Sequence, residues 1–214
     1  MQRIDTVRPF AGGYIAYGVS DGGDRVTIPL TEVRASVAWP ASKNPGYYII
    51  LGKKAQRNPL GKSPLMFLTE GEDYMPTALY RKLMDDTVKM HAFVIYADQG
   101  ADRGRSQSAC YTDLFDFLGS SNIGLAPAPS ASDEEYGVVL VREFLRDKIL
   151  ELPQYRMTTI MNELRAMTGD ADLKDFYAFK ALRYLLAGFV KYQETPPDWS
   201  NVKPPVVMSP VAWT

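Results

Sequence analysis

The feature that most constrains the fold is a strand, helix, strand order in the middle of the chain. Residues 65–70 and 93–98 are short apolar runs closed by glycine or a polar residue, a pattern typical of buried strands. The segment between them begins with Pro76, and proline is well tolerated at a first helical position. A strand, helix, strand order favours a right-handed parallel crossover. We therefore expect an α/β protein in which residues 65–70 and 93–98 are neighbouring parallel strands.

The two helices of this region are expected to place apolar side chains against the sheet. The first carries Leu79, Leu83, Val88 and Met90, and the second carries Tyr111, Leu114, Phe115 and Leu118. Between these helices Asp98 ends the second strand, and open α/β sheets place their functional sites at the carboxyl ends of strands. Asp98 is therefore a candidate site residue, and an ordinary turn-forming carboxylate is the alternative interpretation.

The segments on either side of the crossover complete the expected organisation. Four further strands are expected, over residues 14–19, 25–30, 34–39 and 47–54, and a fifth short strand over residues 123–126. The first two form a hairpin within an N-terminal arm, residues 1–34. Residues 35–192 form the main domain, whose last helix starts near residue 173. Residues 193–214 are rich in proline, which predicts an extended tail.

Composition excludes several classes of protein. The 214 residues include 24 Lys and Arg against 25 Asp and Glu, so no global basic field indicates nucleic-acid binding. Cys110 is the single cysteine, which excludes an internal disulfide framework and a cysteine-rich zinc site. The apolar runs are shorter than a membrane span, and the N-terminus lacks a signal-peptide core. We expect a soluble protein that is made in a reducing compartment and is neither secreted by a signal peptide nor membrane-spanning.

Three stretches together resemble a known family. They are the crossover that ends in Val-Ile-Tyr-Ala-Asp at residues 94–98, the segment 137–164, and Ala-Leu-Arg-Tyr-Leu at residues 181–185. In order and spacing they resemble the nuclease domain of large terminase subunits, the DNA-packaging proteins of tailed phages. The resemblance implies an RNase H-like fold with a mixed five-stranded sheet and helices on both faces. No Gly-x-x-x-x-Gly-Lys-Ser/Thr loop occurs, so the ATPase motor of that family is not expected.

The resemblance also implies a site for metal ions, and this sequence departs from it. The family holds its metals with carboxylates on the first strand, the fourth strand and the last helix, and two-metal chemistry requires such groups to converge. Asp98 matches the fourth-strand acid, whereas Lys180 stands at the last-helix position and residues 37–39 contain no acid. The resemblance therefore implies a degenerate site, in which Lys180 pairs with Asp98 in place of a metal.

Other acidic residues offer substitutes for the two missing ligands. Asp21 supplies the first-strand acid if the strand register is moved to the preceding segment. Asp175 lies five residues before Lys180, a poor helical match because five residues rotate a side chain by more than a third of a turn from its place. Glu70, at the end of the strand over residues 65–70, is a further possible substitute.

Some surface residues are candidates for contacts with partners. The DNA-contact candidates are Lys53, Lys54, Arg57, Lys62, Arg103 and Arg105. Such cations bind phosphate, and a solvated turn is the alternative. Trp199 and Trp213 are candidates for protein interfaces, whose cores are enriched in aromatic residues.

The functional expectation is a catalytically inactive, terminase-nuclease-like protein. It would act as a structural or docking component of a tailed-phage virion, in the head, neck or portal region, or of the DNA-packaging machine. Its partners would be other phage structural or packaging proteins, with dsDNA as a further candidate, in an oligomeric assembly. It would be found in the virion, or in the host cytoplasm during assembly, and no cofactor is expected. The alternative is an active endonuclease subunit of a split terminase, which would use Mg or Mn bound at Asp98.

Overall fold

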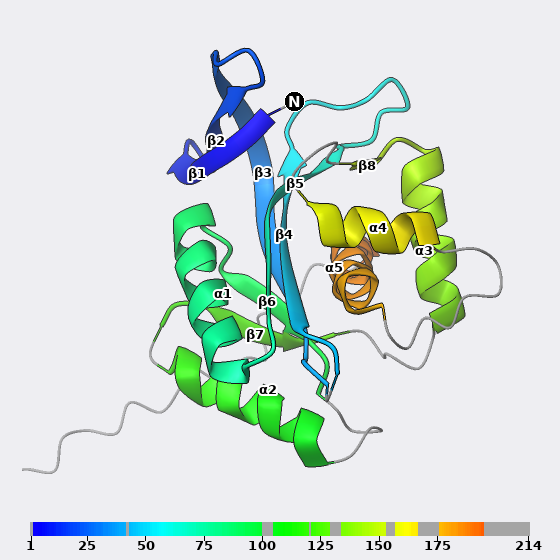
Figure 1. Cartoon of the computed structure of the whole chain (residues 1–214). Coiled ribbons are helices and arrows are strands. Elements are labelled where there is room, and N and C mark those ends of the chain that lie inside the picture. Colours follow the sequence, from blue (N-terminus) through cyan, green and yellow to red (C-terminus); the bar gives the residue numbers. More distant parts are fainter. Residues whose placement is uncertain are drawn as a thin grey trace, which may run out of the picture.

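The protein is a mixed α/β structure built on one large sheet (Figure 1). The computed structural model describes residues 2–41, 43–99, 105–119, 121–128, 134–152, 157–166 and 176–194. The strands are β1 (Gln2–Phe10), β2 (Gly13–Ser20), β3 (Arg25–Ala38), β4 (Gly46–Lys54), β5 (Leu65–Asp73), β6 (Val94–Ala97), β7 (Gly124–Pro127) and β8 (Leu150–Glu151). The helices are α1 (Pro76–Met90), α2 (Arg105–Leu118), α3 (Glu134–Arg146), α4 (Thr158–Ala166) and α5 (Tyr177–Glu194). None of the helices in these residues is long and apolar enough to cross a membrane.

The long strand β3 is the centre of the sheet. One edge of β3 pairs with β4, and β5 and β8 follow beyond β4. The other edge pairs with β2 along its first half and with β6 along its second half. β6 in turn pairs with β7, and β2 with β1. The main body of the sheet therefore has the order β8-β5-β4-β3-β6-β7, and the hairpin of β1 and β2 extends from one end of it.

This arrangement confirms the α/β class and changes the expected number of strands. The described residues form eight sheet strands rather than five. The expected hairpin of residues 14–19 and 25–30 is the pairing of β2 with β3, β1 is a strand that the sequence analysis did not predict, and β8 adds a short pairing to β5. The segments expected as separate strands over residues 25–30 and 34–39 form the single strand β3. A register shift between Leu30 and Glu32 marks where pairing with β4 begins. β3 thus continues through residue 34, where we expected the arm to end.

The prediction that residues 65–70 and 93–98 are neighbouring strands is wrong. β5 and β6 run in the same direction, but β4 and β3 lie between them. β3, β4 and β5 are consecutive antiparallel strands. After β5, helix α1 takes the chain back past β4 to the other edge of β3, where β6 pairs. Helix α1 has 15 residues and a length of about 22 Å, which is enough to pass two strands spaced about 4.8 Å apart.

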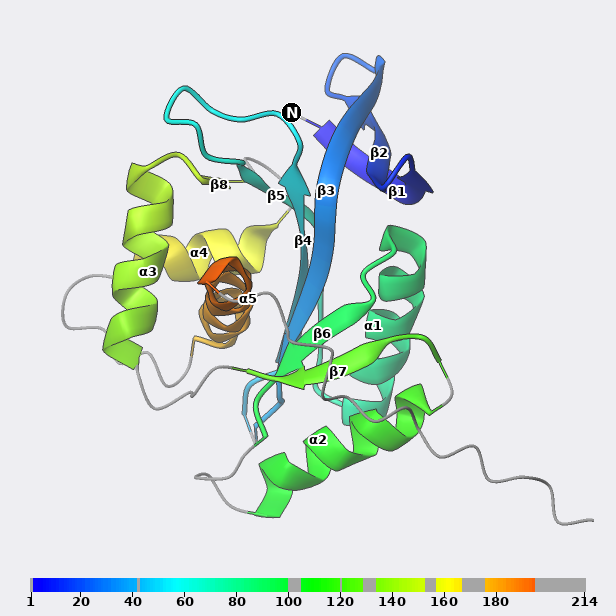
Figure 2. The same ribbon diagram turned by 180° about the vertical axis from the view of Figure 1, so that it is seen from behind.

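Helices cover both faces of the sheet (Figures 1 and 2). α1 and α2 lie on one face, and α5 lies on the other with α3 and α4 outside it. Alternate residues of β4 enter the two cores, with Tyr48 and Ile50 on the α1 side and Tyr47 and Ile49 on the α5 side. Because both faces are covered there, β3 is buried continuously over residues 33–38 and β4 over residues 46–52.

Two residues expected in the core are exposed. Leu79, Leu83 and Met90 of α1 and Leu114 and Leu118 of α2 are buried as predicted. Val88 is 56% exposed and Phe115 is 61% exposed. At 100° per residue each lies well away from the direction of its buried neighbours, so these two assignments were wrong.

Helix α5 is fixed to β3 by buried polar contacts. The Ser36 hydroxyl donates to the carbonyl of Ala181 at 2.7 Å. The buried guanidinium of Arg34 donates to the carbonyl of Gly188 at 3.1 Å and to the Tyr96 hydroxyl at 2.6 Å. These contacts place the start of α5 beside the carboxyl end of β3 and its end beside the middle of that strand.

Candidate functional site

Asp98 lies where β3, β6 and α5 meet. Its backbone carbonyl accepts a hydrogen bond of 2.7 Å from the indole Nε1 of Trp39, the residue that follows β3. Its side-chain Oδ2 accepts one of 3.0 Å from the hydroxyl of Tyr184 on α5. Asp98 is half-buried. The sequence placed Asp98 at a strand end, but nothing in the sequence indicated Tyr184 as its partner.

The fold places Ala38 and Lys180 around Asp98. Val37 of β3 pairs with Ala97 of β6, so the next residues, Ala38 and Asp98, project toward α5 because side chains alternate along a strand. Ala38 is fully buried. Lys180 precedes Tyr184 by one turn and therefore lies on the same side of α5. Its side chain is 8% exposed.

These residues do not fit the metal site that the fold implies. A pair of Mg or Mn ions requires several convergent oxygen ligands. Ala38 has no ligand atom, Lys180 carries an ammonium, and one carboxylate oxygen of Asp98 already accepts from Tyr184. Across the described ranges, no group of three or more His, Cys, Asp and Glu side chains could hold a metal. We therefore assign no metal-dependent step to this site.

Glu70 lies near this site, and its surroundings favour the neutral form of its carboxyl group. It lies on β5 and accepts a hydrogen bond from the hydroxyl of Tyr47, which lies opposite Ala38 on β4. Burial, with the nearby charges of Glu72 and Glu163, raises the pKa of Glu70 to about 8. Glu70 is therefore mostly protonated at neutral pH, and a neutral carboxyl is a poor replacement for a metal ligand.

Glu163 caps the start of α5, a role the sequence did not reveal. Its Oε2 accepts from the N–H of Phe179 at 2.6 Å, and it also accepts from the N–H groups of Tyr177 and Ala178. Burial raises the pKa of Glu163, although these N–H donors act in the opposite direction. Only the packing of α4 against α5 brings this carboxylate to a helix end that lies 14 residues later in the sequence.

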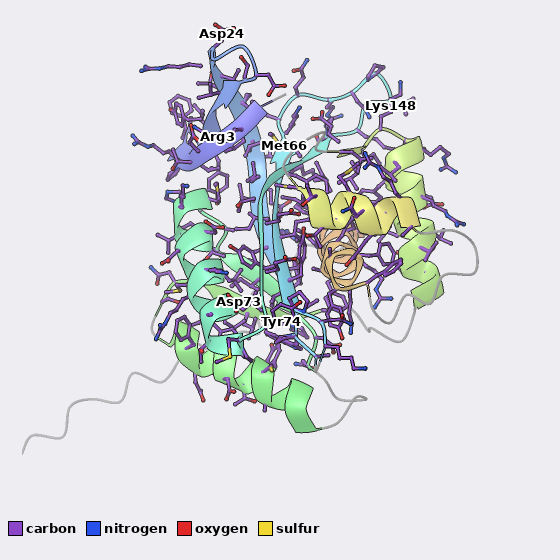
Figure 3. The ribbon with its side chains drawn as sticks, in the orientation of Figure 1. Arg3, Asp24, Met66, Asp73, Tyr74 and Lys148 are labelled. Atoms are coloured by element: carbon purple, nitrogen blue, oxygen red, sulfur yellow. The ribbon has the colours of Figure 1, made fainter. Side chains whose placement is uncertain are left out.

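The alternative register with Asp21 is wrong. Asp21 lies in the turn between β2 and β3, and Figure 3 shows Asp24 of the same turn at the outer end of these two strands. The 14 residues of β3 separate this turn from Asp98 by on the order of 40 Å. Asp21 therefore takes no part in a site with Asp98.

The remaining candidates divide into two groups. Asp175, Arg103, Trp199 and Trp213 lie outside the described residues, and Arg105 is the first residue of α2. Lys53, Lys54, Arg57 and Lys62 lie on the end of β4 and the loop after it, at the opposite end of β4 from Tyr47. They do not belong to the Asp98 site.

The sheet order β8-β5-β4-β3-β6-β7, with helix α5 packed across one face of the sheet, defines an RNase H-like nuclease fold (Figure 1). Among solved structures, the chain is similar to the large-terminase nuclease domain of bacteriophage SPP1, whose crystal structure contains bound Mn. The identity is 15%, the match covers 78% of this chain and 89% of that chain, and the TM-score is 0.52. The match to the large-terminase nuclease of thermophilic phage G20c has 12% identity, covers 85% of this chain and 91% of that chain, and has a TM-score of 0.51. No family model and no curated protein sequence matches. The resemblance inferred from the sequence is thus confirmed at the level of the fold.

Proposed function

We propose that this chain is a terminase-nuclease-like protein that does not cut DNA. It serves as a structural or docking component of a tailed-phage particle, in the head, neck or portal region, or of its DNA-packaging machine. The observation that carries the proposal is the set of residues around Asp98: Ala38 where the first-strand acid belongs and Lys180 where the last-helix acid belongs.

The charges of these residues support the loss of nuclease chemistry. A buried ammonium repels a dication, and this repulsion is strong where the dielectric constant is low. A protein that keeps this fold but lacks the metal ligands acts by binding partners through its surface.

The catalytic half of the proposal is tested with plasmid DNA. Purified full-length protein should leave supercoiled plasmid intact in Mg²⁺ and in Mn²⁺. Metal-dependent cutting that is lost in Asp98→Ala would reject the proposal. That result would support the alternative, an active endonuclease subunit of a split terminase.

The docking half of the proposal concerns the two ends of the chain. β1 pairs only with β2 among the described strands, so its other edge is available to extend a neighbouring sheet. Phe10 near this edge is 64% exposed. The tail contributes Trp199 and Trp213 as interface anchors. The partners are portal, neck or capsid proteins, with dsDNA as a further candidate, and the protein enters the virion after assembly in the host cytoplasm.

A tail deletion tests the docking role. Removal of residues 196–214 should leave the melting temperature of the protein unchanged and prevent its incorporation into particles. Particles are purified from cells that express either the full or the shortened chain, and the protein is detected in them by immunoblot. Normal incorporation of the shortened chain, or absence of the full chain from particles, would contradict the docking role.

A further inference from the structure

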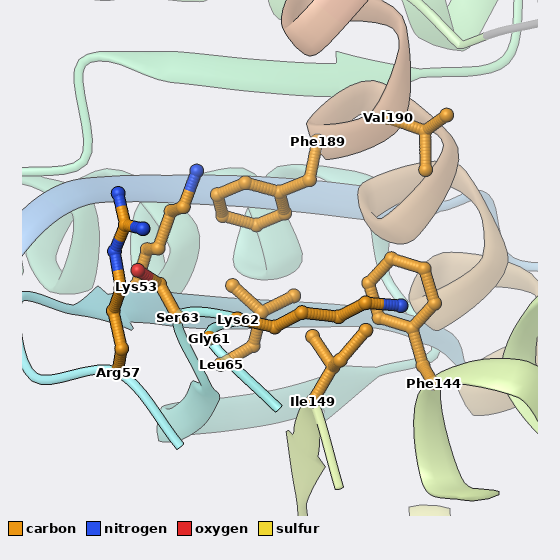
Figure 4. A pocket seen from close by; sticks show the side chains of 10 residues that line it. All are labelled: Lys53, Arg57, Gly61, Lys62, Ser63, Leu65, Phe144, Ile149, Phe189 and Val190. Carbon is orange, nitrogen blue, oxygen red and sulfur yellow. The ribbon is translucent and has the colours of Figure 1, made fainter. Parts of the chain in front are cut away.

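A second site lies at the far end of α5 from Lys180. It is a pocket of about 380 Å³ between the loop after β4, the end of α3 and the end of α5 (Figure 4). Its lining combines three cations, Lys53, Arg57 and Lys62, with an apolar floor. Phe189 lies nine residues after Lys180 on α5, about 13 Å along the helix axis. The pocket is therefore separate from the Asp98 site.

The loop that carries Arg57 and Lys62 is held in place by Asn58, while Lys53 lies on β4. The side-chain Oδ1 of Asn58 accepts from the N–H groups of Leu60 and Lys62, each at 3.0 Å. Its Nδ2 donates to the carbonyls of Asp147 and Lys148 at 3.1 and 3.2 Å, which ties the loop to the turn after α3. The cations consequently project from a fixed backbone, and little loop entropy is lost when a ligand binds.

The rim of the pocket carries excess positive charge. Lys62 forms an ion pair with Asp147 at 2.8 Å, which lowers the pKa of that carboxyl. Among the residues that the structure describes, Lys53 and Arg57 have no ion-pair partner. Three cations with one carboxylate leave two positive charges, which match the dianion of a phosphate monoester.

The floor of the pocket requires a ligand with an apolar body. It is formed by Leu65, Phe144, Ile149, Phe189 and Val190. Figure 4 shows Lys53 and Arg57 on one side near the Phe189 ring, and Lys62 on the other side extending toward the Phe144 ring. Phe144 is half-buried, so part of its surface is available for a planar ring to stack upon, and such stacking contributes about 1–3 kcal/mol per base.

We propose that this pocket binds a nucleoside phosphate. The phosphate lies between Lys53 and Arg57, and the base lies on Phe144 over the apolar floor beside Lys62, with the Ser63 hydroxyl available to the sugar or the base edge. The volume of the pocket suits one nucleotide rather than a longer segment. The nucleotide is either free or the phosphorylated end of a DNA strand, since both present the same chemistry. The identity of this ligand does not depend on whether the Asp98 site cuts DNA.

The test is calorimetric titration of the full-length protein with deoxyadenosine monophosphate. We expect this probe to bind at least about tenfold more tightly than inorganic phosphate or deoxyadenosine. The double variant Lys53→Ala/Arg57→Ala should lose about tenfold or more in affinity for the nucleotide, because each substitution removes a hydrogen bond between a cationic side chain and the phosphate. Phe144→Ala should weaken binding of the nucleotide and leave binding of inorganic phosphate unchanged. Lys54→Ala is the matched control, since Lys54 pairs with Glu151 at 2.6 Å and does not line the pocket.

Competition experiments separate the two sources of the ligand. Displacement by a single-stranded oligonucleotide with a 5′-phosphate, and not by the same strand without it, identifies a strand end. Failure of both strands to compete identifies a free nucleotide, and either result supports the proposal. Three results would overturn it: no binding of the mononucleotide by folded protein, equal binding of inorganic phosphate with no effect of Phe144→Ala, or binding of an acidic peptide to the pocket in place of the mononucleotide. Circular dichroism of each variant verifies that it is folded.

Discussion

The hydroxyl of Tyr184 lies 3.0 Å from Oδ2 of Asp98. This contact joins the last helix to the end of β6 at the place where an RNase H-like nuclease would need a ligand-bearing helix and strand. Tyr184 is 1% exposed, so its hydroxyl needs a partner, because a buried donor without one costs about 1–3 kcal/mol. Asp98 therefore contributes to the packing of α5 on the sheet, whatever else it binds.

Restoring carboxylates around Asp98 should create a metal site. In the double variant Ala38→Asp/Lys180→Asp, three carboxylates meet at the ends of β3, β6 and α5. Saturating Mn²⁺, at about a hundred times its dissociation constant, should stabilise the variant by about 2.7 kcal/mol and raise its melting temperature by roughly 5–10 °C. The melting temperature of the wild type should not change. Adding Asp98→Asn to the double variant should remove the shift, and an equal shift in the wild type would contradict the prediction.

Glu70 should make the protein less stable as pH rises. Its pKa is raised from 4.5 to about 8 in the folded state, so between these values the unfolded chain loses a proton that the folded protein retains. The contribution of Glu70 to the free energy of unfolding is therefore fully present below pH 4.5 and is lost as pH rises through 8. Glu70→Gln keeps the site neutral, so its melting temperature should exceed that of the wild type by a few degrees above pH 8 and match it near pH 4.5.

Thermal unfolding across this pH range measures the effect of Glu70. Glu143→Gln, on the exposed part of α3, is the control and should follow the wild-type curve. Parallel curves for Glu70→Gln and the wild type would show that burial does not hold this proton.

Removal of the cap on α5 should destabilise the fold. Glu163→Ala leaves the N–H of Phe179 and its neighbours without their carboxylate acceptor, and lost caps of this kind cost about 1–2 kcal/mol. Glu163→Gln retains an acceptor oxygen and should lose less. The midpoint of urea unfolding reports both values. Glu143→Ala is the control, and an equal loss in that variant would argue against capping as the cause.

Alanine at position 188 should reverse the usual effect of removing glycine from a helix. Glycine to alanine in a helix interior normally adds about 1 kcal/mol of stability. A Cβ on Gly188 would lie 2.5 Å from the Tyr96 ring, and overpacking of this kind costs about 1–3 kcal/mol. Gly188→Ala should therefore lower the urea midpoint. In a Tyr96→Ala background the same substitution should cost less, and a stabilised Gly188→Ala single variant would show that the ring moves without penalty.

Local patterns in the sequence determined the elements of the central crossover. Apolar runs of strand length and Pro76 at a first helical position predicted β5, α1 and β6. The same short-range information placed Asp98 at a strand end, whereas the interest of Lys180 came from the resemblance to the terminase nuclease family, which implies an acid at that position. The elements and the place of Asp98 depend on residues that are close in sequence, and periodicity and backbone preferences report them directly.

Only the tertiary structure decided which distant segments meet. Periodicity is the same whichever strand lies beside β6, so the sequence did not show that β3 and β4 separate it from β5. It likewise did not show that Glu163 caps α5 or that Phe144 and Phe189 complete a pocket with Lys53. These contacts arise because two apolar faces of one sheet must be covered at the same time, and the packing that achieves this selects partners far apart in the chain.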